Sequence, residues 1–244
     1  MSDTVSVSII VPVYEEEYNI VPNIDDIISK LGQFGVKEFE LLIFASTQRL
    51  SALPDYLTAD KKILLFDHEG CNEIGGIFAR GIKLASEEYV GLITPYNQFS
   101  LEGLGTVFEA LRKNDMVATY IKNPKARPWH RTLASVVNTL LVNLLFGLRI
   151  KYYHECFYRS RLVKKVRFTT ASHAAMVEAA IWIAKSGASI AHVPFVMIPH
   201  NFKSKSRAFR FKNIIEIFKT YIQLFWQIRV LGKRIDLGRR REYE

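Results

Sequence analysis

The residues best suited to chemistry follow a single apolar run near the start of the chain. Residues 9–13 are apolar or proline, and Tyr14 and three consecutive glutamates, Glu15, Glu16 and Glu17, come directly after them. A continuous apolar run is typical of a parallel strand that is covered on both faces. Polar side chains at the carboxyl end of such a strand line the ligand site of an open α/β sheet. The segment therefore predicts a ligand site at a sheet edge.

The first half of the chain alternates between short apolar runs and amphipathic stretches. Strands that alternate with helices imply βαβ units, so we expect an α/β fold with a mostly parallel central sheet. The predicted strands are residues 5–13, 38–44, 62–66, 89–93 and 115–120, and the predicted helices are residues 23–34, 74–85 and 101–112.

The second half of the chain is richer in helix. Residues 131–148, 174–185 and 211–230 are predicted helices, and residues 189–198 form a strand that Pro194 marks as an edge or bulged strand. The helix over 131–148 has a broad apolar face at helical spacing, made of Leu133, Val136, Val137, Leu140, Leu141, Leu144, Leu145 and Leu148.

Composition limits the class of protein. A chain of 244 residues can build one α/β domain with a sizeable core. The formal net charge is +9, and residues 201–244 hold twelve Lys and Arg against four Asp and Glu. A basic end suggests anionic lipid head groups, a phosphorylated substrate or nucleic acid, or else a solvated tail.

Targeting and redox signals are sparse. Cys71 and Cys156 have no metal-ligand spacing, and two cysteines support no disulfide framework, so a reducing, cytosolic setting is the default expectation. Residues 1–7 lack the basic start of a signal peptide, and no run of 18 apolar residues predicts a membrane span.

Several motifs occur in the order typical of one family. They are the strand block at residues 8–20, a glycine-rich helix start at 70–85, Arg131, Ser135, Asn138 and Gly147 on a long helix, Cys156-Phe157-Tyr158-Arg159, and Lys203-Ser204-Lys205. The chain resembles family 2 glycosyltransferases, and most closely the polyprenyl-phosphate sugar synthase branch. The resemblance implies a three-layer GT-A (nucleotide-diphospho-sugar transferase-like) fold over residues 1–200. A basic amphipathic C-terminal helix and tail, residues 201–244, would pack on or beside it.

The resemblance also implies where a nucleotide-sugar donor binds. The family holds Mg²⁺ or Mn²⁺ with an Asp-x-Asp after its fourth strand, where this chain has Thr94-Pro95-Tyr96-Asn97-Gln98. The acidic motif after the second strand is likewise replaced, by Phe44-Ala45-Ser46-Thr47. The donor-binding residues implied by the resemblance are Pro12, Tyr14, Glu16, Ser46, Thr94, Asn97 and Gln98.

No catalytic residue and no metal ligand are assigned from the sequence. A Mg²⁺ or Mn²⁺ site would have to be rebuilt around Glu16, Asp67 and Glu69. Charged loops beside a sheet are more often solvated faces than metal sites.

An anionic acceptor would need cations rather than a general base, because a lipid phosphate oxygen is already charged near neutral pH. The candidate residues for holding phosphate are Lys122, Arg127, Arg131, His200, Lys203, Lys205 and Arg207. The alternative is that they form a solvated basic loop.

Two hypotheses follow for function. The first is a glycosyltransferase in lipid-linked sugar or surface glycan assembly, with an atypical or metal-independent site. The second is a catalytically inactive relative that acts as a binding or scaffold subunit. In either case, residues 211–230 are expected to contact a membrane surface or a partner protein. A homo-oligomer is a further alternative. The aromatic residues there lie on an apolar helical face, which disfavours nucleic acid. The expected location is cytoplasmic, with peripheral attachment to the inner face of the membrane as an option.

Overall fold

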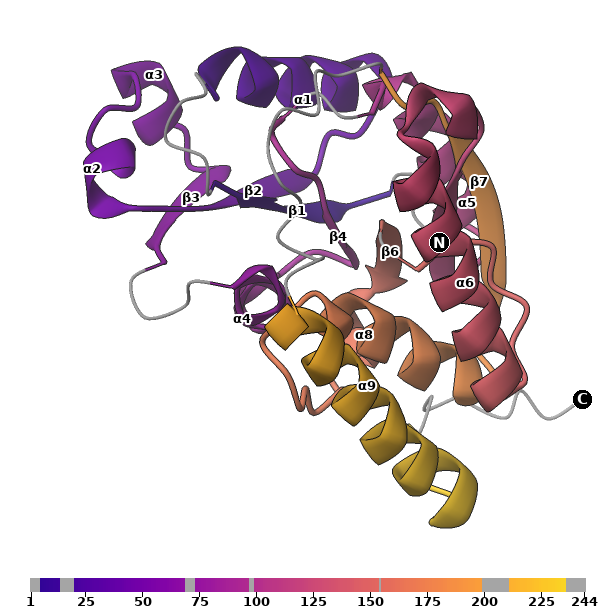
Figure 1. Cartoon of the computed structure of the whole chain (residues 1–244). Coiled ribbons are helices and arrows are strands. Elements are labelled where there is room, and N and C mark those ends of the chain that lie inside the picture. Colours follow the sequence, from indigo (N-terminus) through magenta and orange to yellow (C-terminus); the bar gives the residue numbers. More distant parts are fainter. Residues whose placement is uncertain are drawn as a thin grey trace, which may run out of the picture.

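The computed structural model describes residues 5–13, 20–68, 73–96, 99–153, 155–198 and 211–235, and within them the side chains of 211–214 are left aside. A central sheet carries helices on both faces, as Figure 1 shows. The predicted three-layer α/β architecture is therefore confirmed.

The sheet has seven strands, and six of them run in the same direction. Strand β6 is antiparallel to both of its neighbours, β4 and β5, whereas all other pairs are parallel. The spatial order is β3-β2-β1-β4-β6-β5-β7. The strands are β1 (Val7–Pro12), β2 (Phe39–Ala45), β3 (Ile63–Asp67), β4 (Tyr89–Leu92), β5 (Met116–Ile121), β6 (Cys156–Arg159) and β7 (Ile190–Phe195).

The predicted helices are all present, with boundaries that move by a few residues. The helix expected over 101–112 begins as a 3-10 turn, and the last helix ends in a π turn. The short elements α2, α3, α7 and β6 were not predicted. The helical elements are α1 (Val21–Gln33), α2 (Thr47–Leu50), α3 (Asp55–Thr58), α4 (Ile74–Leu84), η1 (Leu101–Gly103), α5 (Leu104–Leu111), η2 (Pro124–Ala126), α6 (Trp129–Phe146), α7 (Ser160–Val163), α8 (Ala174–Lys185), α9 (Phe211–Phe225) and η4 (Trp226–Val230).

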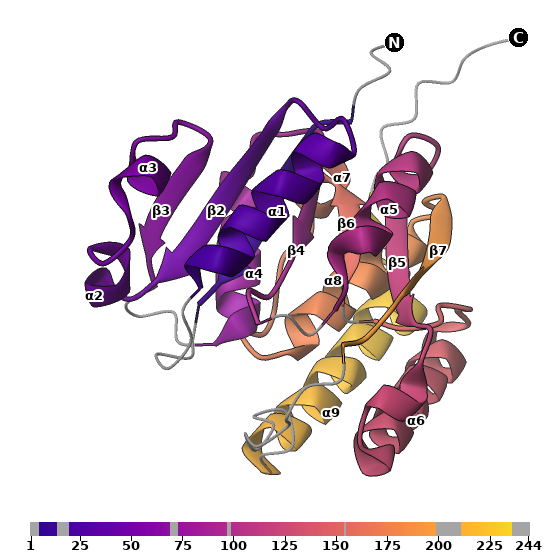
Figure 2. The same cartoon turned by 90° about the horizontal axis from the view of Figure 1, so that it is seen from above.

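Two hydrophobic cores lie on opposite faces of the sheet. Along β1, Ile9 and Val11 pack with α1 and α5, whereas Ile10 packs with α4 and α8. Figure 2 shows α1 and α5 in front of the sheet and α4 and α8 behind it. Successive side chains of a strand point to opposite faces, so a strand between two helical layers buries both sets of side chains and is mostly apolar. This is why residues 9–12 of β1 form a continuous apolar run, while the buried Ser8 hydroxyl donates to the Glu40 carboxylate at 2.6 Å.

The strand order creates a switch point beside β1. The chain builds outward from β1 to β2 and β3, and then crosses back to place β4 on the other side of β1. Ligands of open α/β sheets bind at such a point, outside the carboxyl ends of the strands. The strand that contains Pro194 is β7, which lies at the sheet edge as predicted.

Helices α6 and α9 pack together beyond the sheet. The Tyr221 hydroxyl donates to Asn138 Oδ1 at 2.7 Å, and Arg229 Nε donates to the Leu145 carbonyl at 3.2 Å. Much of the predicted apolar face of α6 nevertheless stays exposed, as at Leu140 and Leu144. No helix in the described part of the chain is both long and apolar enough to cross a membrane.

Glycine is required where β6 enters the sheet. A Cβ on Gly91 of β4 would meet the Phe157 ring of β6, with even the more distant Cγ only 2.9 Å away. We predict that Gly91→Ala lowers the free energy of unfolding by about 1–3 kcal/mol, because Phe157 must shift within a packed core. Urea unfolding measures this change.

The matched control is Gly32→Ala in α1. A Cβ there meets nothing within 4 Å, so alanine should stabilise the helix by about 0.5–1 kcal/mol. Equal effects of the two substitutions would contradict the packing assigned to β6.

Candidate functional site

The carboxyl ends of β1, β2 and β4 meet at one sheet edge. Ile10 pairs with Leu92, and the Ile93 amide donates to the Ile10 carbonyl at 3.0 Å, which carries the register toward Pro12 and Thr94. Ser46 follows β2 and precedes α2. The predicted donor-side residues Pro12, Ser46 and Thr94 therefore share this edge, while Tyr14, Glu16, Asn97 and Gln98 lie outside the described residues.

Elements that are distant in the sequence hold Pro95 and Phe99, which follow β4. Asn23 of α1 donates its side-chain amide to the Pro95 carbonyl at 2.5 Å. Phe99 pairs with Met197 as an isolated β-bridge. The Asn123 side-chain amide donates to the Met197 carbonyl and accepts from the Met197 amide, both at 2.8 Å. Such fixed backbone suits a binding site, because positioned groups lose little freedom when a ligand binds.

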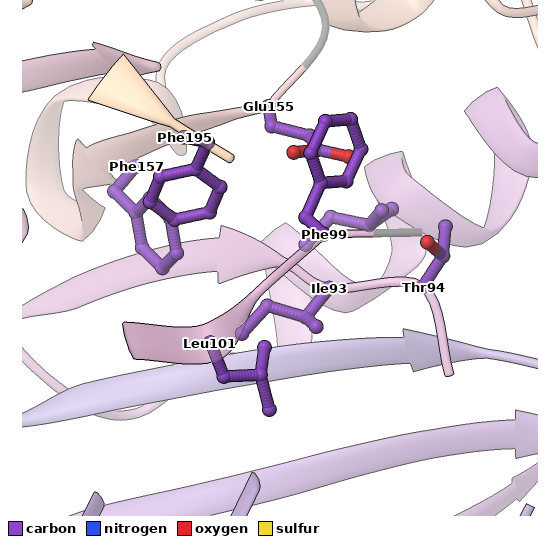
Figure 3. Close-up of a pocket in the computed structure, with 8 residues that line it drawn as sticks. Ile93, Thr94, Phe99, Leu101, Glu155, Phe157 and Phe195 are labelled. Carbon is purple, nitrogen blue, oxygen red and sulfur yellow. The ribbon is translucent and has the colours of Figure 1, made fainter. Parts of the chain in front are cut away.

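A buried carboxylate lies beside the end of β4. Glu155 immediately precedes β6 and is 6% exposed. Glu155 lines a pocket with Thr94, Phe99 and Phe195. Figure 3 shows that the side chains around Glu155 and Thr94 are apolar or aromatic. Removing a carboxylate from water is unfavourable, so a buried one facing a pocket is a common mark of a functional site.

The backbone of Glu155 is fixed by its neighbour in the sheet. The Thr119 amide and hydroxyl both donate to the Glu155 carbonyl, at 3.0 and 2.7 Å, and Thr119 is 1% exposed. This contact sets the position at which β6 begins and hence the position of the carboxylate.

Two predicted phosphate-binding arginines lie together at the start of α6. Arg127 Nη1 donates to Ser135 Oγ at 2.9 Å. Burial, and next the Arg127 guanidinium, lower the pKa of Arg131, so the two cations interact. Like charges brought close repel each other, and an anion that contacts both relieves that repulsion.

Tyr152 connects this arginine pair to Glu155. Burial raises the pKa of the Tyr152 phenol, Arg127 opposes that rise, and Glu155 adds to it. Its hydroxyl is within hydrogen-bonding reach of Arg127 and Ser135. One cluster, which we name the Arg–Tyr–Glu cluster (Arg127, Arg131, Tyr152 and Glu155), therefore adjoins the end of β4.

The loop that carries Tyr152 is shaped by Asn143 of α6. The Asn143 amide donates to the Ile150 carbonyl at 2.9 Å, and its oxygen accepts from the Ile150 amide at 3.1 Å and from the Tyr153 hydroxyl at 2.6 Å. Gly147 ends α6 in the left-handed region at φ 62°, which glycine adopts without strain.

The ends of β2 and β3 carry a different set of contacts. Thr47 Oγ1 donates to the Asp67 carboxylate, and Arg80 donates to the Asp67 carbonyl at 2.7 Å while lying over Phe44 and Phe66. These contacts order the edge beside Ser46.

The described residues do not supply the metal site that the fold family implies. Among them, no group of three His, Cys, Asp or Glu side chains could hold a metal ion. Of the three carboxylates proposed for a rebuilt site, Asp67 is described, whereas Glu16 and Glu69 lie outside the described residues. The part of the site that the structure describes therefore does not fit Mg²⁺ or Mn²⁺.

The remaining predicted phosphate-binding residues are divided. Lys122 follows β5 and is exposed, with its amide bonded to the Phe195 carbonyl at 2.8 Å. His200, Lys203, Lys205 and Arg207 lie outside the described residues. Cys156 is buried, and burial raises the pKa of its thiol to about 12, which suits a core residue rather than a nucleophile.

Comparison with known proteins defines the fold. No protein-family model and no curated protein matches the sequence. Solved structures of glucosyl-3-phosphoglycerate synthase from Mycobacterium tuberculosis do match. The complex with Mn²⁺, uridine-diphosphate and phosphoglyceric acid gives a TM-score of 0.60 at 15% identity, covering 96% of this chain and 81% of that one. The complex with uridine-diphosphate gives 0.61 at 14% identity, covering 96% and 82%.

A third structure of that enzyme, with no ligand named, gives a TM-score of 0.54 at 17% identity, covering 96% of this chain and 83% of that one. At these identities the likeness establishes the fold alone. The chain has the GT-A fold, as its motif order indicated.

The sequence did not reveal Tyr152 or Glu155 as site residues. Strand β6 has only four residues and was not predicted, so the sequence did not indicate that Glu155 would lie beside the end of β4. The usable signal was Cys156-Phe157-Tyr158, an apolar run that directly follows the carboxylate.

Removing the Asn143 side-chain amide should loosen the site. We predict that Asn143→Ala lowers the free energy of unfolding by about 1–3 kcal/mol, because buried partners on Ile150 and Tyr153 lose their hydrogen bonds. Thermal and urea unfolding test this. Thr139→Ala, a half-buried polar position on the same helix, is the control, and an equal loss there would contradict a special role for Asn143.

Proposed function

We propose that this protein is a glycosyltransferase that moves a sugar from a nucleotide-sugar donor to a phosphate-bearing acceptor. In this proposal protein cations, rather than an Asp-x-Asp metal site, balance the phosphate charge. The observation that supports it best is the Arg–Tyr–Glu cluster beside the end of β4, at the switch point of a GT-A sheet.

The structural neighbours support the choice of ligands by analogy. Structures of the mycobacterial enzyme contain uridine-diphosphate-glucose together with phosphoglyceric acid, a nucleotide sugar and a phosphorylated small molecule. Since fold alone does not carry chemistry, the assignment depends on this chain's own residues.

The reaction is a substitution at the anomeric carbon. A phosphate oxygen of the acceptor forms a bond to that carbon, and the bond from the carbon to the diphosphate oxygen breaks, with the electron pair leaving on the diphosphate. A phosphate monoester is already anionic near pH 7, so no proton needs to be removed from it. Arg127 and Arg131 hold the acceptor phosphate and lower the repulsion between it and the departing group.

Glu155 has a positioning role in this scheme. Its carboxylate accepts hydrogen bonds from hydroxyl groups of the donor sugar, next to Thr94 at the end of β4. The wider donor site is proposed to include Pro12, Tyr14, Glu16, Ser46, Asn97 and Gln98.

The acceptor is proposed to be a lipid phosphate or a glycan-linked phosphate, as in the polyprenyl-phosphate branch that the sequence resembles. Lys122, His200, Lys203, Lys205 and Arg207 would add positive charge on that side. Peripheral attachment to a membrane, with residues 211–230 in contact, is part of the same proposal.

A specific observation also favours a catalytically inactive relative. The described strand ends carry Ala45 and Ser46 at the end of β2, and Thr94 and Pro95 after β4, where the family has carboxylates. Such a protein would keep the fold and bind a partner without transferring sugar.

Donor binding tests the transferase proposal, because an enzyme that transfers a sugar must bind its donor. We predict that calorimetric titration with a panel of uridine, guanosine, adenosine and thymidine diphosphate sugars detects binding of at least one. Its affinity should change little when Mn²⁺ is added, because Thr94-Pro95-Tyr96 stands where the family that the chain resembles has its Asp-x-Asp. The absence of binding to every donor, with and without Mn²⁺, would refute the transferase proposal.

The arginine pair should control turnover once a donor is known. Arg127→Ala and Arg131→Ala are each predicted to lower kcat/KM about 10–100-fold, since a hydrogen bond to a charged group contributes about 1.5–3 kcal/mol. A coupled assay for released nucleoside diphosphate measures this. Arg112→Ala, an exposed arginine at the end of α5, should leave the rate unchanged. Rates insensitive to all three substitutions would place the acceptor site elsewhere.

A further inference from the structure

Helix α6 exposes an apolar stripe that the proposed reaction does not use. Its side chains are between 49% and 80% exposed. After His130, every exposed residue of α6 belongs to this stripe. We name this surface the α6 stripe; it consists of Trp129, Leu133, Val136, Val137, Leu140 and Leu144.

The stripe is not the core-facing side of the helix. Val142 and Phe146 are fully buried and point to the opposite side, where Phe146 packs against Phe225 of α9 with ring centroids 6.5 Å apart. The spacing of the stripe residues keeps them within about one third of the helix circumference. Large contiguous apolar surfaces on a folded protein usually mark a contact with another molecule or a membrane.

Positive charge flanks the stripe at both ends. Between Asp115 and Glu155 the sequence has no Asp or Glu and six Lys or Arg. Four of these six cations are exposed. Lys122 and Lys125 come before the helix, and Arg149 and Lys151 come after it.

This charge pattern selects between possible occupants. If a second copy packed its own α6 stripe against this one, a parallel or an antiparallel arrangement would bring cationic ends together without an acid to pair with them. A bilayer that contains anionic lipids matches both features, because its acyl region receives the apolar side chains and its head groups attract the flanking cations.

We propose that the α6 stripe docks this protein on an anionic phospholipid bilayer, with α6 lying in the interface. Trp129 lies at the amino end of the stripe and is 76% exposed, which suits the interfacial position that tryptophan favours. The neighbouring helix α9 also exposes apolar side chains, including Phe218, Ile222 and Trp226. Docking through α6 extends the membrane contact beyond residues 211–230.

Vesicle sedimentation tests the proposal. Because the measurement needs no sugar donor, failure of the membrane proposal is distinguishable from failure of the transferase assignment. The purified full chain is spun with vesicles of phosphatidylcholine alone, or of phosphatidylcholine and phosphatidylglycerol in equal amounts. We expect binding to the mixed vesicles that weakens as salt is added. Leu140→Glu should lower the partition coefficient about tenfold or more, because a charge replaces an apolar contact.

The control is Leu84→Glu, which introduces the same change at an exposed leucine at the end of α4, outside the stripe. It should bind vesicles like the unmodified chain. Equal binding by Leu140→Glu and the unmodified chain would overturn the proposal. So would a dimer in analytical ultracentrifugation that Leu140→Glu dissociates, accompanied by no vesicle binding, since a second copy would then cover the stripe.

A second measurement locates the contact. In a Trp226→Phe background, lipids brominated in their acyl chains should quench the fluorescence of Trp129, whereas Trp182 is buried in the core and should remain unquenched. Vesicle binding without quenching of Trp129 would show that another surface carries the membrane contact, and would overturn the assignment to α6.

Discussion

The candidate site depends on one constraint, the insertion of the antiparallel strand β6 between β4 and β5. Because β6 runs against its neighbours, its amino end lies at the edge where the parallel strands have their carboxyl ends. Glu155, the residue before β6, therefore lies at the sheet edge that carries the candidate site. Gly91 leaves the space that Phe157 needs, and Thr119 fixes the starting point of the strand through two hydrogen bonds. A parallel strand at this position would have placed the same carboxylate at the opposite edge.

Electrostatics at that edge differ from what an acidic metal site would produce. The described ends of β2 and β4 are neutral, while α6 and the turn before it bring two guanidinium groups into interaction beside Tyr152. An acidic site gains an overall balance of charge by recruiting a cation. A site dominated by arginine gains it by recruiting an anion, and this is the reason for proposing that the arrangement binds a phosphate group.

Helix α6 links several parts of the molecule. Near its start it carries Arg131 and Ser135, through Asn143 it shapes the loop that leads to Tyr152, and its buried side packs on α9. Its outward side is apolar, and the chain on both sides of it is basic. A membrane contact on that side and an acceptor phosphate held by Arg127 and Arg131 would therefore be served by one rigid element, which suits an acceptor that resides in a bilayer.

The order of strands and helices was predictable from the sequence, because period and length of apolar runs report local structure directly. The continuous run in β1 indicated a strand covered on both faces, and motif order indicated the GT-A fold.

Three features were decided only in the tertiary structure. Strand β6 is too short to show a period, and the approach of Tyr152 to Arg127 and Glu155 depends on a loop fold that Asn143 sets from 7 to 10 residues away. The third is the orientation of α6. Apolar residues at helical spacing look the same whether they face a core or the outside, so only the packing of Val142 and Phe146 decided that the leucines of the stripe would remain exposed.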